Sequence, residues 1–184
     1  MVCSYKLVYY PNPILRKVCE PVEDFNDDLK YLVSEMIRIM HLNDGIGIAA
    51  PQVGSLKSVF IMSTSLPSEE EGNDVQNSSE EHHPIVFINP TILSKGDSYK
   101  IFQEGCLSIP SVYANVQRSS EVTLRYYTLM GEECEDTFTG MQAICVQHEV
   151  DHLNGKLFID YLGKMQRFMA LEKLRKYMKK RGIE

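Results

Sequence analysis

The sequence predicts a single compact α+β domain over residues 1–184, in which mostly antiparallel sheets surround a central helix and an amphipathic helix closes the chain. The length is sufficient to bury a sizeable core but short for two domains. Runs rich in β-branched and aromatic residues are separated by turn residues, whereas other segments have helical periodicity. No apolar run approaches the roughly 18 residues that cross a membrane, so a membrane partner is not expected.

The strands are predicted from short runs of valine, isoleucine, phenylalanine and tyrosine between turn residues. Four such strands are expected, at 58–62, 85–89, 122–129 and 134–139. The last two are separated by Met-Gly-Glu-Glu at 130–133, which is typical of a hairpin turn. This arrangement favours antiparallel pairing.

Three segments have the spacing of apolar residues that a helix requires. The first, 29–40, is followed by Gly45, which would suit a loop that ends the helix. A central helix is expected over 140–154, with Gly155 as its left-handed cap. The last helix, 163–181, is expected to pack its apolar side against the domain. That side carries Phe168, Leu171, Leu174 and Met178.

The central helix carries the most informative motif, His148-Glu149-x-x-His152. Residues four apart leave the same face of a helix, about 6 Å apart along its axis, so both imidazoles can bind one metal ion. Glu149 lies one step round the helix, where it can move protons on a metal-bound water without being a ligand. The motif therefore predicts a hydrolytic metal site.

A hydrolytic metal also needs a third protein ligand and an open position for water. Metzincins place a histidine three residues after the glycine that follows the motif, but this chain has Phe158 there, which excludes that class. Glu172 could serve as the downstream ligand of a thermolysin-like site, so a zinc endopeptidase is the alternative function. However, Glu172 lies in a run typical of a surface helix, where an exposed charge is ordinary.

Cysteine is the better candidate for the third ligand. The chain has five cysteines and no recognisable secretory leader, which indicates reduced thiols rather than a disulfide framework. Cys145 is one helical turn before His148, but its apolar neighbours are typical of a buried hydrophobic position. Cys106 follows a glycine, and Pro110 should soon end the strand ladder, which would present a strand end to a site. Spacing alone leaves Cys106 only modestly ahead of Cys145.

Three motifs occur in order along the chain: GIGIAAPQ at 45–52, EGCLS at 104–108 and QHEVDHLNG at 147–155. Together they resemble the signatures of the peptide deformylase family, and the likeness extends over about residues 5–165. The resemblance implies that Cys106 binds one divalent metal together with the two histidines of the central helix. It implies Fe(II) as the physiological metal, and zinc, nickel or cobalt can substitute because a thiolate and two imidazoles suit all four.

The resemblance also implies a catalytic role for three residues. Glu149 would act as the general base and then as the acid that protonates the leaving amine. Gln52 and the backbone N–H of Leu107 would donate hydrogen bonds to the formyl oxygen as it becomes an oxyanion. On this basis the chain is expected to remove the formyl group from the N-terminal formyl-methionine of newly synthesised polypeptides.

The substrate is expected to lie against the glycine-rich first motif, since a backbone without Cβ atoms lets an extended peptide approach as an added strand. The methionine side chain would meet one face of the central helix, although spacing alone would indicate core packing there. The expected substrate-binding residues are Gly45, Ile46, Gly47, Gly105, Tyr113, Met141, Ile144 and Cys145. Tyr113 departs from the family, because typical members have an arginine at this position. Its hydroxyl can still form hydrogen bonds, but it is uncharged at neutral pH.

Two segments have opposite charge. Residues 65–84 form an acidic run that predicts a surface insertion, and the histidine pair within it, His82-His83, is typical of solvated side chains. The last helix is strongly basic, although the whole chain has a net charge of −6. Such a helix could dock on ribosomal RNA, where deformylases meet nascent chains; the other interpretation is a solvated helix face. We expect a cytoplasmic enzyme of bacterial type that acts on formyl-methionyl nascent peptides, with no DNA partner.

Overall fold

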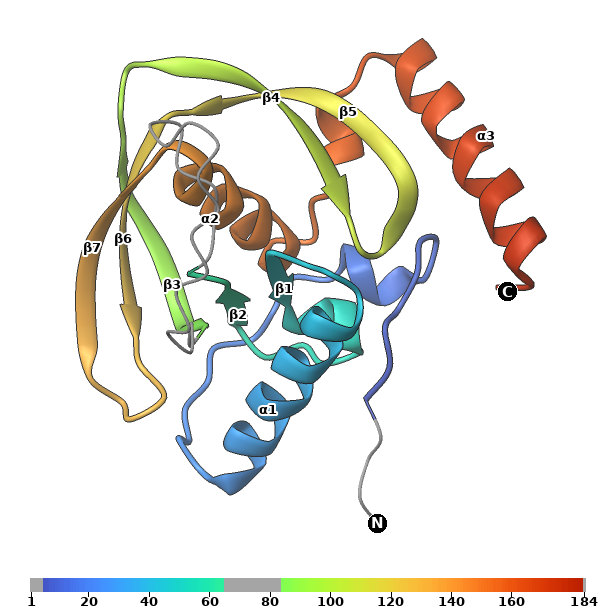
Figure 1. Ribbon diagram of the computed structural model, residues 1–184. Helices are drawn as coiled ribbons and strands as arrows, with labels where there is room; N and C mark the ends of the chain where they lie inside the picture. Colours follow the sequence, from blue (N-terminus) through green and yellow to red (C-terminus); the bar gives the residue numbers. More distant parts are fainter. Residues whose placement is uncertain (1–4, 65–83, 184) are drawn as a thin grey trace, which may run out of the picture.

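The computed structural model describes residues 5–64 and 84–183 and has the expected α+β class (Figure 1). Its three α-helices are α1 (Asp27–Leu42), α2 (Gly140–Leu153) and α3 (Lys164–Arg181). Short 3-10 helices are η1 (Pro13–Arg16), η2 (Ala50–Val53) and η3 (Phe158–Tyr161). The predicted insertion, including His82-His83, lies outside the described residues except for its last position.

The strands form two antiparallel sheets. The five-stranded sheet has the order β1 (Gly47–Ala49), β2 (Val59–Met62), β3 (Ile85–Lys95), β6 (Glu121–Tyr127) and β7 (Glu133–Thr139). The two-stranded sheet pairs β4 (Tyr99–Cys106) with β5 (Ile109–Ser119). The four predicted strands are confirmed, although β3 extends to Lys95, whereas β1, β4 and β5 were not predicted.

The core is organised around α2, which contacts strands of both sheets (Figure 1). Apolar residues of α2 pack against the large sheet, where the rings of Phe60 and Phe87 stack 4.3 Å apart. A second cluster lies between α1 and the edge of that sheet, and a third joins β5, η3 and α3. Since the core surrounds α2 on several sides, most side chains of this helix are buried, including both histidines of the HExxH motif.

The helix ends agree with the predictions in part. The carboxamide of Asn26 caps α1 by accepting from the Leu29 N–H at 3.0 Å, and Gly155 takes the predicted left-handed conformation after α2, with φ 68°. After α1, Gly45 lies in the loop that ends the helix, as predicted, and its N–H donates to the Met40 carbonyl at 3.0 Å. The left-handed residue of this loop is Asp44, with φ 52°, a conformation that aspartate tolerates better than most residues. A Cβ at Gly45 would lie 2.8 Å from the Leu107 side chain, so the glycine permits a close contact there.

The hairpin of β4 and β5 contains a bulge next to its turn. Cys106 pairs with Ile109, but the next pair is Gly105 with Tyr113, so three residues of β5 have no partner on β4. The expectation that Pro110 ends the ladder is therefore wrong: its missing N–H falls in the bulge, and pairing resumes beyond it. As a result, Tyr113 lies directly across from Gly105.

The helix α3 packs on β5 and η3 at one side of the molecule (Figure 1). Its apolar side is only partly covered, since Leu174 is buried whereas 62% of Phe168 is exposed, contrary to the predicted packing of that residue. In the described residues, none of the helices has the length and apolar character that a membrane crossing requires.

Candidate active site

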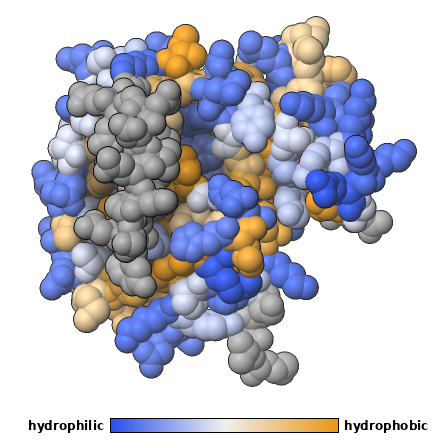
Figure 2. Space-filling view, viewed as in Figure 1, coloured by the Kyte–Doolittle hydropathy of each residue, from blue (hydrophilic) through white to orange (hydrophobic). Residues whose placement is uncertain are grey.

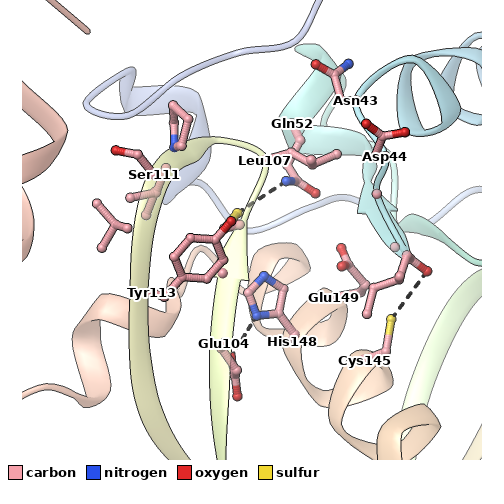
Figure 3. Close-up of a pocket in the computed structure, with 18 of the residues that line it drawn as sticks. Asn43, Asp44, Gln52, Glu104, Leu107, Ser111, Tyr113, Cys145, His148 and Glu149 are labelled. Carbon is pink, nitrogen blue, oxygen red and sulfur yellow. Dashed lines mark hydrogen bonds and ion pairs between the residues drawn. The ribbon is translucent and has the colours of Figure 1, made fainter. Parts of the chain in front are cut away.

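A cavity of about 580 Å³ lies between β1, the β4–β5 hairpin and α2 (Figure 3). This volume is typical of sites for small ligands. Figure 2 shows apolar surface in the middle of this face of the molecule, with hydrophilic side chains around it. Every expected substrate-binding residue lines the cavity: Gly45, Ile46, Gly47, Gly105, Tyr113, Met141, Ile144 and Cys145. Gln52, Leu107 and Glu149 line it as well.

Three potential metal ligands meet at the inner end of this cavity. Cys106, His148 and His152 each direct one ligand atom into a group whose members lie within 4.8 Å of one another. The Cys106 Sγ is 3.2 Å from His152 Nε2, and the two imidazole centroids are 5.1 Å apart. The strand end supplies the thiol and consecutive turns of α2 supply the imidazoles, so residues far apart in the sequence form one compact donor set.

The other candidates for a third ligand do not join this group. The thiol of Cys145 donates to the Ile46 carbonyl at 3.7 Å, and burial raises its pKa well above the ordinary value, so it is a protonated thiol. Glu172 forms an ion pair with Arg175 at 2.8 Å on α3 and belongs to no such cluster in the described part of the chain. The endopeptidase alternative is therefore not favoured.

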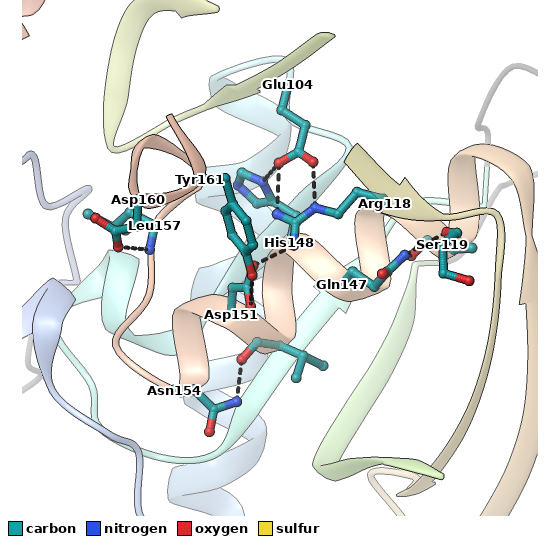
Figure 4. Close-up of polar contacts among 12 residues, drawn as sticks. Glu104, Arg118, Ser119, Gln147, His148, Asp151, Asn154, Leu157, Asp160 and Tyr161 are labelled. Carbon is teal, nitrogen blue, oxygen red and sulfur yellow. Dashed lines mark hydrogen bonds and ion pairs between the residues drawn. The ribbon is translucent and has the colours of Figure 1, made fainter. Parts of the chain in front are cut away.

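The orientation of His148 is fixed by a carboxylate behind it (Figure 4). The Nδ1 of His148 is 2.8 Å from Glu104 Oε2. Because an ionised carboxylate only accepts, Nδ1 carries the hydrogen, and Nε2 is left for a metal. Sequence reasoning gave Glu104 no role, although it opens the second motif beside Cys106.

Glu104 is held in turn by a buried ion pair. Arg118 donates to both of its oxygens, at 2.7 and 3.0 Å, and to Asp151 at 2.6 Å. The hydroxyl of Tyr161 reaches Asp151 at 2.9 Å, and the guanidinium of Arg118 stacks on the Tyr161 ring (Figure 4). These residues were also missed from sequence. The only available signal was Asp151, a charge between the two motif histidines.

The electrostatics of the site suit a bound cation. Burial alone would raise the pKa of Glu104, but hydrogen bonds from His148 and Arg118 lower it to about 2. Burial would lower the pKa of His148, yet hydrogen bonds with Cys106 and Glu104 raise it well above the ordinary value. The surroundings of the His148 ring therefore favour a positive charge on or beside it, and either a proton or a bound metal ion can supply that charge. Burial lowers the pKa of His152, which favours the neutral imidazole that a metal requires.

Glu149 lies beside the donor set and is itself almost fully buried. Burial raises its pKa to about 7, and its Oε2 has no hydrogen-bond partner among the described residues. Gly47 permits this position, since a Cβ there would lie 2.6 Å from Glu149 Oε1 and 2.8 Å from the Cys145 sulfur. A carboxylate with a pKa near neutrality and a free oxygen is suited to accept and return a proton.

Gln52 is oriented by the strand that precedes it. Its Oε1 accepts from the Ala49 N–H at 2.8 Å, so its Nε2 points toward Cys106, 3.4 Å from the sulfur. Leu107 lies in the turn between β4 and β5, directly after Cys106, and its side chain approaches Gly45 across the cavity. The side-chain donor of Gln52 is therefore directed at the thiol, and Leu107 is labelled near Gln52 in Figure 3.

A half-buried thiol and two buried imidazoles beside a carboxylate of raised pKa, at the end of an open cavity, define a metal-dependent hydrolase. The chain belongs to the peptide deformylase family, whose members remove N-formyl groups: the model of that family, described as Polypeptide deformylase, matches residues 4–168. The peptide deformylase of Maricaulis maris is 41% identical over 174 residues, which cover 95% of this chain and 94% of that protein. That of Rhizobium meliloti is 39% identical over 178 residues, covering 97% and 96%.

Solved structures agree with this assignment. The crystal structure of a peptide deformylase from Legionella pneumophila has a TM-score of 0.84 with 36% identity, over 98% of both chains. The Ehrlichia chaffeensis peptide deformylase in complex with actinonin has a TM-score of 0.83 with 35% identity, over 94% of this chain and 96% of that one.

Proposed function

We propose that this enzyme removes the formyl group from N-terminal formyl-methionine, with Cys106, His148 and His152 holding one divalent metal ion. The observation that carries the proposal is the group of three ligand atoms within 4.8 Å of one another, two of them on buried histidines, beside the buried Glu149. When bound, the metal lowers the pKa of a water and draws electron density from the formyl carbonyl. We propose Fe(II) as the working metal, with zinc, nickel or cobalt able to replace it, since the donor set suits all four.

Glu149 acts first as the general base and then as the general acid of the reaction. Its unpartnered Oε2 takes a proton from the attacking water, and the same oxygen then returns the proton to the nitrogen of the leaving amine. A pKa of about 7 makes both transfers feasible near neutral pH. The products are formate and a peptide with a free N-terminal methionine.

Two donors stabilise the negative charge that develops on the formyl oxygen. The Nε2 of Gln52 is already directed at the site because its own oxygen is occupied by Ala49. The backbone N–H of Leu107 is the second donor, placed by the tight turn after Cys106. Since both are fixed before substrate binds, they need little reorganisation during the reaction.

The peptide lies extended between β1 and β4. Within the described residues, β1 pairs only with β2 and β4 only with β5, so each strand has one edge without a ladder partner, and the cavity lies between them. The segment Gly45, Ile46 and Gly47 contributes one wall, and Gly105 with Tyr113 contributes the other. The methionine side chain enters between Met141, Ile144 and Cys145 of α2.

We further propose that the enzyme works in the bacterial cytoplasm at the ribosome. The four described cysteines are free thiols, as a reducing compartment favours. Figure 2 shows mostly hydrophilic surface over the C-terminal end of α3, where Lys179, Lys180 and Arg181 are exposed. If α3 docks on ribosomal RNA, binding should weaken as salt rises and should be lost when residues 173–184 are removed. Binding that changes with neither would contradict the docking.

The decisive experiment measures formate release from a formyl-methionyl peptide by enzyme loaded anaerobically with Fe(II). We expect Glu149→Ala to lower turnover at least about a hundredfold while the metal stays bound. The matched control is Glu172→Ala, which makes the same change on α3 and should keep parental activity. Formate release that survives in the first variant, or is lost in the second, would contradict the assignment of roles, and no formate from metal-loaded parent would overturn the function.

A further inference from the structure

Tyr161 ends the short helix η3 and lies against the buried ion pair behind the donor set (Figure 4). Its hydroxyl donates to Asp151, whose two oxygens are 3.1 and 2.9 Å away. The guanidinium of Arg118 lies 4.5 Å from the centroid of its ring. The side chains of Arg118 and Asp151 are only 4% and 15% exposed, whereas Tyr161 is 49% exposed. Tyr161 therefore lies between this ion pair and solvent.

Two carboxylate oxygens, each shared by two donors, connect the Tyr161 hydroxyl to the His148 imidazole. The Oδ2 of Asp151 accepts from Tyr161 at 2.9 Å and from Arg118 at 2.6 Å. The Oε2 of Glu104 accepts from Arg118 at 3.0 Å and from His148 Nδ1 at 2.8 Å. Because a change at one donor alters the bond that the same oxygen forms with the other, a change at the hydroxyl extends to the imidazole.

The guanidinium of Arg118 is held on its edges and on its face. Its Nε and Nη2 donate to the two oxygens of Glu104, and its Nη1 donates to Asp151. The ring of Tyr161 covers its face through a cation–π contact. A guanidinium fixed in this way presents Glu104 in one position, and Glu104 in turn orients His148.

The helix η3 is itself fixed, so Tyr161 acts from a defined position. Asp160, the preceding residue, accepts from the Leu157 N–H at 2.9 Å. It also forms ion pairs with Arg16 of η1 and with Arg167 of α3. Three segments of the chain therefore hold the end of η3 against the network.

We propose that Tyr161 is a positioning residue of the metal site. It holds the guanidinium of Arg118 in place, and Arg118 acts through Glu104. The result is a His148 imidazole fixed in the orientation that binds metal. The inference rests on the proposed function, because it takes His148 as a metal ligand. Tyr161 is not among the described residues that line the cavity, so its substitution should change metal binding and turnover but not substrate affinity.

The test uses Tyr161→Phe, which removes the hydroxyl and keeps the ring. Competition with a coloured chelator should show the dissociation constant for Co(II) rising about fivefold, which is less than for a group that contacts a metal ligand directly. The visible absorption bands of the Co(II)-loaded enzyme should shift, because they depend on how the imidazole is held. With a formyl-methionyl peptide, kcat should fall about threefold while KM is unchanged. Tyr161→Leu also removes the contact with the guanidinium face, so it should change each quantity further in the same direction.

Tyr127→Phe is the matched control, since it removes a hydroxyl that donates to Glu133 at 2.8 Å between two strands of the large sheet. It should keep the parental dissociation constant and spectrum. Thermal unfolding of the metal-free proteins separates positioning from folding. If Tyr161→Phe lowers Tm but leaves Co(II) affinity and spectrum unchanged, its role is only structural and the inference is overturned.

Equal changes in Tyr161→Phe and Tyr127→Phe would also overturn the positioning role. The failure of the proposed function has a different signature, because it would appear as metal-loaded parent that releases no formate. In that case the Co(II) affinities and spectra would still decide whether Tyr161 positions His148.

Discussion

The inner wall and the mouth of the cavity are built in different ways. At the inner wall, Glu104, Arg118 and His148 are buried and joined by hydrogen bonds of 2.7 to 3.0 Å, so each fixes the next. At the mouth, Asp44 and Tyr113 are exposed, and neither is part of such a network. The difference predicts that the two regions can be altered separately: substitutions at the inner wall should affect folding, metal binding or turnover, and substitutions at the mouth should leave folding and metal binding intact.

The largest effect is expected from Arg118→Met. This change removes the guanidinium that pairs with the buried Glu104 and the half-buried Asp151, which should lower the free energy of unfolding by about 3 to 5 kcal/mol in urea denaturation. Arg38→Met is the control, because it breaks an ion pair with Glu35 that is exposed on α1. A loss of stability equal to that of the control would mean that the inner network does not hold the site.

Glu104→Gln should weaken metal binding roughly 10- to 100-fold, because an amide accepts less strongly from His148 and can present its NH2 group to that ring instead. Competition with a coloured chelator measures the dissociation constant directly. Glu35→Gln, on the surface of α1, should bind metal as the parent does. If both variants bind equally well, Glu104 is only a structural partner of Arg118.

Gly47→Ala tests the junction between the two regions. The new methyl group would displace Glu149 or Cys145, and we expect kcat to fall about tenfold, since small misplacements of a catalytic group are costly. Gly163→Ala, which places its Cβ at an ordinary 3.7 Å from Gln166 Oε1, should change kcat little. Parental turnover in the first variant would show that Glu149 has more room than this structure allows.

The smallest effect is expected from Tyr113→Phe. With 64% of the side chain exposed and no network to disrupt, the free energy of unfolding should stay within ~0.5 kcal/mol of the parent. Metal affinity should also be unchanged. A large loss of either property would remove the separation between inner wall and mouth.

The sequence predicts the helical part of the site better than the sheet part, for a physical reason. The central helix follows from the spacing of His148 and His152 and from the cap at Gly155, which are all local signals. The strands β4 and β5 escape detection because β4 begins with three exposed residues and because the buried face of the hairpin carries the charged side chains of Glu104 and Arg118, so apolar alternation is weak. The strand β1 has three residues, which is too short for any period.

The supporting residues could not be found for a related reason. Glu104 comes close to Arg118 because β4 and β5 pair in one hairpin, and it comes close to His148 because α2 packs on that hairpin. No local sequence pattern indicates either contact. The same holds for Asp44, whose left-handed backbone lies in the loop after α1 and whose exposed side chain lines the mouth of the cavity.

The two strand edges that flank the cavity have a consequence for the range of substrates that the enzyme can accept. A strand edge pairs with backbone N–H and C=O groups, which every residue other than proline offers whatever its side chain. An enzyme that binds its substrate through backbone hydrogen bonds at a strand edge can accept many sequences after the methionine.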